Sequence, residues 1–359
     1  EGEGEGEGEG EGEGEGEGEG SFVCNNGSCE SSEGEGPENC PLDCPSTDSC
    51  GNIYGGSFSA ASQEEIAELA TYCEVSGAVK IKSADGLATF SLPQLKRIGG
   101  DLSVRDNSDL IDFQFPALTM VGGDLTVMMN HELKTFEVLE LINVGGNVVI
   151  SDSDTLEAFE FPKTYYVGDL SVSTSPGLVW FGFPALKYVQ TDVRVETIDA
   201  LVGFEFPWLT EVGESMTLAD LISIADFNFP SLLSMGTLSV SNNSDLTSLK
   251  APGITSLEEL ALFGNNSLGS FEFEALEYVG TVSVSNNHGL KSFKLTSLKE
   301  VGGMLGIFGN LALPQCLVDA LVTQVEDSGG VGGTLKTTGN RDDCACVLLN
   351  SILVASCAD

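Results

Sequence analysis

The chain has 359 residues, 41% of them apolar, which is enough for a large buried core in one long domain or two ordinary ones. Its 55 acidic and 15 basic residues give a formal net charge of −40, and residues 1–79 contain no Lys or Arg. A protein this acidic repels nucleic acids and anionic membranes, so we expect it to bind neither. No apolar run reaches the roughly 18 residues that a membrane-spanning helix needs.

The N-terminal segment, residues 1–20, consists of ten Glu-Gly dipeptides. This acidic low-complexity tail cannot bury a core, so we expect it to be disordered in isolation. Ordering it would require contacts from cations or from a second chain. The chain begins at Glu1 and not at Met, which indicates a processed protein or a fragment.

Residues 21–49 are expected to form a small cysteine-rich module. Four cysteines within 21 residues leave no room for a core, so disulfides must hold the segment together. Its pattern resembles the C-x-N-G-x-C…C-P-x-D-C modules of extracellular proteins. Its acids could bind calcium, although an acidic loop held by two disulfides is the simpler interpretation. The residues concerned are Cys24, Cys29, Cys40 and Cys44, with the acids Glu33, Glu35, Glu38 and Asp43.

The ten cysteines lie only near the two ends of the chain. The six outside the small module are Cys50, Cys73, Cys316, Cys344, Cys346 and Cys357. This distribution is typical of disulfides that close the ends of a domain in an oxidising compartment, which predicts a secreted or cell-surface protein. A zinc site is not favoured, because the two histidines, His131 and His288, are far in sequence from every cysteine.

Two helices are predicted, both outside the repetitive part of the chain. The first spans Ser62–Tyr72, where Ser62 is the N-cap and Glu65 completes a capping box. The second covers about Gln315–Gln324.

From about residue 74 the sequence repeats, and this is its strongest pattern. The common unit is F-x-F-P-x-L-x-x-V-G-G-D-L-S-V-S-x-N-x-x-L, in which apolar and polar residues alternate as in strands and Gly, Asn and Pro leave no room for a helix. We therefore predict an all-β fold, a right-handed parallel β-solenoid of about ten coils stacked about 4.8 Å apart. Its core column, one residue every 22 or 23, comprises Phe90, Phe113, Phe136, Phe159, Phe181, Phe204, Phe227, Leu249, Phe271 and Phe293.

A second column of asparagines supports this register. An inward Asn at a corner of each coil can bond backbone groups of the next coil that would otherwise be buried unpaired. Ile198 and Leu221 interrupt the column in the middle coils. Its members are Asn107, Asn130, Asn243, Asn265, Asn287 and Asn310.

Residues 50–359 are expected to form the solenoid domain. Within it, through the helix ending in ELATYC, the repeat F-P-x-L-x-x-V-G-G-D-L-S-V and the closing GNLALPQC, about residues 50–357 resemble receptor L domains. These are the ligand-binding solenoids of growth-factor and insulin receptors, and the repeat is also similar to fungal cell-wall relatives. The resemblance implies helical caps at both ends, because an uncovered solenoid end exposes unpaired backbone groups. It further implies a Cys50–Cys73 disulfide, and a bond from Cys316 to one of Cys344, Cys346 and Cys357.

Two outward rows are candidate sites. The first is a flat row of mostly small residues that could dock a protein or a glycan, or simply tolerate solvent: Ser103, Thr126, Val149, Ser171, Arg194, Thr217, Ser239, Ala261, Ser283 and Gly306. The second is a row of turn residues that could bind calcium, although solvated carboxylates are the default: Asp101, Asp124, Asn147, Asp169 and Asp192.

Three N-glycosylation sequons begin at Asn26, Asn242 and Asn265. We predict glycans at Asn242, just before the asparagine column, and at Asn26, in a cysteine loop. Asn265 belongs to the inward column and is discounted.

The sequence favours a protein that is not an enzyme and needs no cofactor. His131 and His288 are seven coils apart, no catalytic pair is evident, and uniform coils leave no long loop to build a cleft. We expect a structural subunit of an extracellular filament, wall or matrix that associates with itself or with a fibre protein. The alternative is a cell-surface recognition module that binds a protein or a glycan through the solenoid face.

Overall fold

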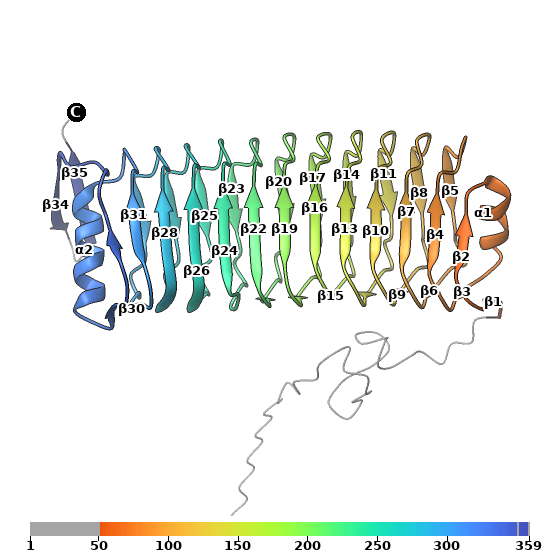
Figure 1. The fold of residues 1–359 in the computed structure, drawn as a ribbon, viewed down its shortest axis with the longest axis horizontal. Helices are drawn as coiled ribbons and strands as arrows, with labels where there is room; N and C mark the ends of the chain where they lie inside the picture. The colour runs from red at the N-terminus through yellow and green to blue at the C-terminus, as the bar shows by residue number, and fades with distance from the viewer. Residues whose placement is uncertain (1–50, 350–351, 358–359) are drawn as a thin grey trace, which may run out of the picture. The chain divides into compact units, whose positions relative to one another are not determined.

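The computed structural model describes residues 51–349 and 352–357, which form a parallel β-solenoid of roughly 11 coils (Figure 1). The predicted all-β solenoid is confirmed. The structure has about one coil more than expected, because strands already form ahead of Phe90, where the aromatic column begins. The predictions for residues 1–20 and 21–49 lie outside the described residues.

Each coil contributes to three walls, which we name the long wall, the short-strand wall and the Phe wall. Pairing between coils is parallel, as in the step from Leu102 to Leu125 to Val148. The long wall contains β2 (Phe58–Ala60), β4 (Val79–Lys82), β7 (Leu102–Arg105), β10 (Leu125–Met128), β13 (Val148–Ser151), β16 (Leu170–Ser173), β19 (Val193–Glu196), β22 (Ser215–Ala219), β24 (Thr237–Ser241), β26 (Ser256–Phe263), β28 (Tyr278–Ser285), β30 (Glu300–Val301), β31 (Leu305–Phe308), β32 (Gly330–Val331) and β33 (Leu335–Lys336).

The other two walls consist of strands of two or three residues. The short-strand wall contains β1 (Ile53–Tyr54), β3 (Glu74–Val75), β6 (Arg97–Ile98), β9 (Met120–Val121), β12 (Asn143–Val144), β15 (Tyr166–Val167), β18 (Tyr188–Val189) and β21 (Glu211–Val212). The Phe wall has three separate sheets: β5 (Thr89–Ser91), β8 (Asp112–Gln114) and β11 (Thr135–Glu137); β14 (Ala158–Glu160), β17 (Trp180–Gly182) and β20 (Gly203–Glu205); β23 (Asp226–Asn228), β25 (Ser248–Lys250), β27 (Ser270–Glu272) and β29 (Ser292–Lys294).

The predicted aromatic column forms the core behind the Phe wall. Successive rings stack almost parallel, with centroids 5.3 Å apart for Phe90 and Phe113 and 5.2 Å apart for Phe159 and Phe181. Phe204 and Phe293 also stack on the preceding ring of the column, but both are only partly buried. Phe204 lies on β20 and Phe293 on β29, each a terminal strand of its sheet. Phe136, Phe159 and Phe227 also lie on terminal strands and are buried, so the position of the strand does not by itself set the exposure.

The asparagine column is buried and forms a ladder along the solenoid. In Asn265 the side-chain amide donates to Val240 O, while its Oδ1 accepts from the backbone N–H of Asn243. The same two bonds recur at Asn287, which bonds Leu262 O and the Asn265 backbone. Ser153 and Ser175 occupy the column before Ile198 and Leu221, so the asparagine ladder is interrupted from Ser153 to Leu221.

Helices cover the two ends of the solenoid (Figure 1). Helix α1 (Gln63–Leu69) begins at the predicted N-cap, where the Ser62 hydroxyl accepts from the Glu65 backbone, but it ends three residues before Tyr72. Helix α2 (Gln315–Glu326) is two residues longer than predicted.

Disulfides hold the C-terminal cap together. Cys316 on α2 pairs with Cys346, one of the three partners that the resemblance allowed. Cys344 pairs with Cys357 and closes the hairpin of β34 (Cys344–Leu349) and β35 (Ile352–Cys357). Cys73 is disulfide-bonded as well, but its predicted partner Cys50 lies outside the described residues.

Candidate docking face

The row of small residues predicted as a docking face lies in one continuous register on the long wall. Ser103 pairs with Thr126, and the register continues coil by coil to Ser283 and Gly306. Arg194 is the only long side chain among the predicted members, and its guanidinium contacts Asp192 Oδ2 at 2.6 Å. The intervening members are Val149, Ser171, Thr217, Ser239 and Ala261.

Two phenylalanines break the flatness of this face toward its C-terminal end. Phe263 and Phe308 belong to a second outward row on the same strands, with Ser285 between them. Phe263 is 49% exposed, whereas the Lys336 ammonium lies 3.4 Å from the ring centre of Phe308. The face therefore combines a flat row of mostly small side chains with one exposed aromatic ring, that of Phe263.

The acidic row beside this face is a ladder of hydrogen bonds. Each side chain accepts a hydrogen bond of 2.8 to 3.2 Å from the backbone N–H of the residue one coil further on. This bonding engages one side-chain oxygen of each member. The described residues contain no group of three or more His, Cys, Asp and Glu that could hold a metal ion, and calcium binding by this row remains a prediction. The acceptors are Asp101, Asp124, Asn147, Asp169 and Asp192.

This ladder explains the second glycine of the Gly-Gly pairs that precede Asp124 and Asn147. A Cβ on Gly123 would lie 2.2 Å from Asp101 Oδ1, and a Cβ on Gly146 would lie 2.3 Å from Asp124 Oδ1. The carboxylate of one coil thus occupies the space beside the second glycine of the next. A Cβ on the first glycine, Gly122, would collide instead with the backbone carbonyl oxygen of Gly99.

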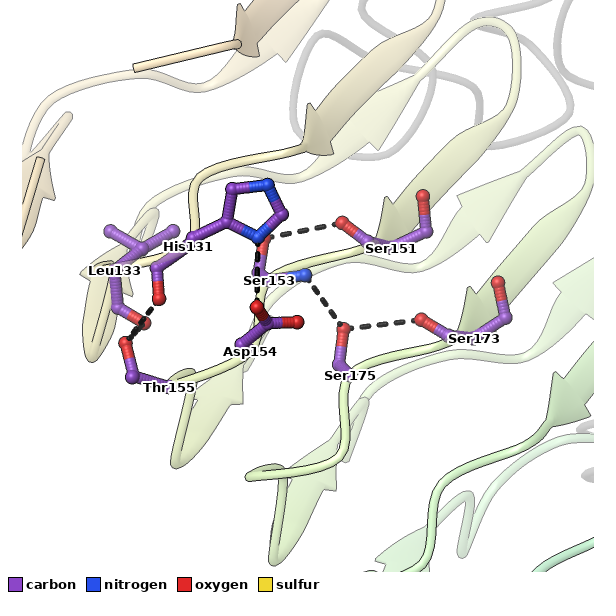
Figure 2. A network of polar contacts seen from close by, with 8 residues as sticks. All are labelled: His131, Leu133, Ser151, Ser153, Asp154, Thr155, Ser173 and Ser175. Atoms are coloured by element: carbon purple, nitrogen blue, oxygen red, sulfur yellow. Dashed lines mark hydrogen bonds and ion pairs between the residues drawn. The ribbon is translucent and has the colours of Figure 1, made fainter. Parts of the chain in front are cut away.

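One polar network was missed in the sequence. His131 Nδ1 lies 2.9 Å from Asp154 Oδ2, because the two residues occupy the same turn position in adjacent coils (Figure 2). Their separation of 23 residues, one repeat, was the signal that could have revealed the pair. Around it, the Thr155 hydroxyl donates to His131 O, and the buried Ser153 hydroxyl donates to Ser151 O.

The network does not form a catalytic triad. Ser153 is fully buried and its hydroxyl bonds a backbone carbonyl and not the imidazole. The Ser175 hydroxyl similarly donates to Ser173 O (Figure 2). The His131–Asp154 pair itself is more than half exposed, so water competes for its hydrogen bond.

The two sequon asparagines among the described residues, Asn242 and Asn265, differ sharply in exposure. Asn242 is exposed and has a backbone φ of 57°, at the corner of its coil. Asn265 is 0% exposed and its amide is engaged in the ladder, so a glycan there is incompatible with the folded solenoid. Asn26 lies outside the described residues. Glycosylation of Asn242 remains a prediction.

No helix among the described residues is long and apolar enough to cross a membrane. No protein-family model matches the chain, and a search of curated proteins found no match. The likeness to receptor L domains therefore rests on the residues of the repeat and the caps.

Proposed function

We propose that the chain is a non-catalytic extracellular structural subunit of a surface filament, wall or matrix. The observation that carries this proposal is the in-register row of small side chains along the long wall, from Ser103 to Gly306. Small side chains let two such faces approach closely over many coils, and the hydroxyls of Ser and Thr can bond across the contact. The disulfides fit the oxidising compartment that this role requires.

The covered ends favour lateral association over end-to-end stacking. Helices α1 and α2 lie where the sheets would otherwise offer open edges, which are the usual route to strand-by-strand polymerisation (Figure 1). Among the described residues, the long wall is the sheet with the most strands. Growth of a filament or wall would then proceed through this face.

Assembly of the full chain tests the proposal. Electron microscopy and analytical ultracentrifugation of wild-type protein should show ordered polymers or lateral oligomers. Replacing Thr217 and Ser239 together by Arg places two charges at the centre of the face, which should abolish assembly while circular dichroism stays unchanged. The control replaces Asn228 and Ser292 on the Phe wall by Arg, which adds the same charge elsewhere and should leave assembly intact.

Phe263 favours a second candidate function, recognition of a partner through the same face. An exposed aromatic ring surrounded by small residues is the kind of anchor around which binding energy concentrates. The likeness to receptor L domains supports this alternative. A full chain that remains a monodisperse monomer would overturn the structural proposal, and loss of partner binding on Phe263→Ala would then support recognition.

A further inference from the structure

The short-strand wall holds most of the unpaired polar atoms found in the interior of the described residues. Four buried side-chain atoms of the described residues have no hydrogen-bond partner. Three of them, Arg97 Nε and both amide atoms of Asn143, belong to one outward row of this wall, and the fourth, Asp112 Oδ1, lies on the Phe wall. Asn143 is only 1% exposed. Such concentration contrasts with the ladder asparagines, whose amides are fully bonded.

The row continues with aromatic residues. From Arg97 it runs through Met120 and Asn143 to Tyr166 and Tyr188, one residue per coil. At the standard strand spacing of about 4.8 Å, Arg97 and Tyr188 are about 19 Å apart along the solenoid axis.

Tyr188 is part of a cluster with a cation. Its ring meets Tyr165 edge-to-face at 5.5 Å between centroids. The Lys187 ammonium lies 5.3 Å from the centre of the Tyr188 ring and 6.0 Å from that of Tyr165. Aromatic rings beside a few polar groups are the usual lining of sites for small molecules and sugars.

We propose that this strip, residues Arg97, Met120, Asn143, Tyr166 and Tyr188 with Tyr165 and Lys187, binds a neutral, extended polysaccharide. Sugar hydroxyls both donate and accept, which matches the unpaired amide of Asn143 and the donor of Arg97. The C–H faces of pyranose rings stack on an aromatic ring such as that of Tyr188. Met120 adjoins Asn143 in the row and is only 5% exposed, so the ligand must displace its flexible side chain to reach the amide.

Charge and geometry select this ligand class. The two cations of the strip, Arg97 and Lys187, lie near its opposite ends, and the row is flanked by Glu74 beside Arg97 and by Glu211 beside Tyr188, so it offers no continuous basic track for a polyanion. The chain as a whole carries −40, which opposes an acidic polymer further. A straight row with a constant step fits a straight chain, such as a β-1,4-linked glucan, better than a coiled one.

Isothermal titration calorimetry of the full chain tests the site with cellohexaose, against maltohexaose and an alginate oligomer. Wild-type protein should bind cellohexaose more tightly than either comparison sugar. Asn143→Leu, of similar shape but without the amide, should weaken binding at least tenfold while thermal stability is kept or raised. Tyr188→Ala should also weaken it, whereas Tyr278→Ala, an exposed tyrosine on β28, should not.

Absence of heat with millimolar cellohexaose overturns the proposal, as does tighter binding of alginate or maltohexaose. Wild-type affinity in both Asn143→Leu and Tyr188→Ala also overturns it and leaves Asn143 as a structural residue. The strip lies on a different wall from the proposed assembly face. Failure here therefore leaves lateral assembly untouched, and the Arg substitutions on the long wall should not change sugar binding.

Discussion

Single residues of the aromatic column show how burial, and not residue type, sets the contribution to stability. Phe181 is 0% exposed and stacks on Phe159 and Phe204 at 5.2 Å on each side. Phe204 has the same type and column position, yet it is partly buried and its ring tilts by 35° against Phe227. The two positions therefore differ in how far the ring is buried and not in residue type.

Phe181→Ala should therefore lower the free energy of unfolding by about 3–5 kcal/mol, the usual loss for a large aromatic ring removed from a core. Phe204→Ala should lower it by clearly less, since part of that ring already contacts water. Equilibrium denaturant unfolding of both variants checks this. Equal losses would contradict the argument from burial.

Asp112 is a residue whose burial works against stability. Burial raises the pKa of its carboxyl above the ordinary 3.8, opposed by a hydrogen bond from the Phe113 backbone, and its buried Oδ1 has no partner. A raised pKa means that the folded state binds more protons than the unfolded state, so stability falls as pH rises from about 3.8 through the folded pKa.

Asp112→Asn, which cannot ionise, should thus raise the melting temperature at pH 7 and lose this advantage at pH 3. Glu272→Gln should act in the opposite direction at pH 7. The hydrogen bond from Lys294 lowers the pKa of Glu272, so its stabilisation is present above pH 4.5 and is lost as pH falls through the folded pKa. Thermal melts from pH 3 to 8 check both signs; parallel curves for wild type and Asp112→Asn would refute the assignment.

At the scale of one coil, the corner before the asparagine column demands a left-handed backbone. Residues there have φ between 45° and 68° in coil after coil. Glycine, Asn and Asp tolerate this conformation, but Thr197, at φ 58°, is β-branched and strained. The repeat places Asp220 at the same corner one coil later, with φ 55°.

Thr197→Asn should therefore stabilise the protein by about 1 kcal/mol through relief of this strain. Asp220→Asn, the matched control, should change stability little, because Asp already tolerates a positive φ. Urea unfolding of the two variants provides the measurement. A gain in both, or in neither, would show that the corner conformation is not what limits stability at Thr197.

At the scale of the whole molecule, two ladders of side-chain hydrogen bonds tie the coils together over different lengths. The acidic ladder runs from Asp101 to Ser215. The asparagine ladder is continuous from Asn243 to Asn340 but interrupted from Ser153 to Leu221. The middle coils therefore lack buried amide bonds at their asparagine corner.

We expect this interruption to make the solenoid open first at the corner of the middle coils. In hydrogen exchange followed by mass spectrometry, peptides covering Ser153–Ile198 should exchange faster than those covering Asn243–Asn310, because the latter corner amides bond Asn side chains. Uniform protection along the solenoid would mean that the aromatic column alone sets the cooperativity.

The sequence by itself determined the solenoid, its core column and its inward asparagines, because a fixed step of 22 or 23 residues forces equivalent side chains onto the same wall of successive coils. Only the tertiary structure decided which groups of neighbouring coils bond to each other. It selected Cys346 as the partner of Cys316, turned the acidic row into acceptors for backbone N–H groups, and brought His131 to Asp154. It also left the side-chain amide of Asn143 without a hydrogen-bond partner, between Met120 and Tyr166 in its row. The physical reason is that periodicity fixes the direction of a side chain, whereas its partner depends on distances of a few ångströms between coils that no local pattern encodes.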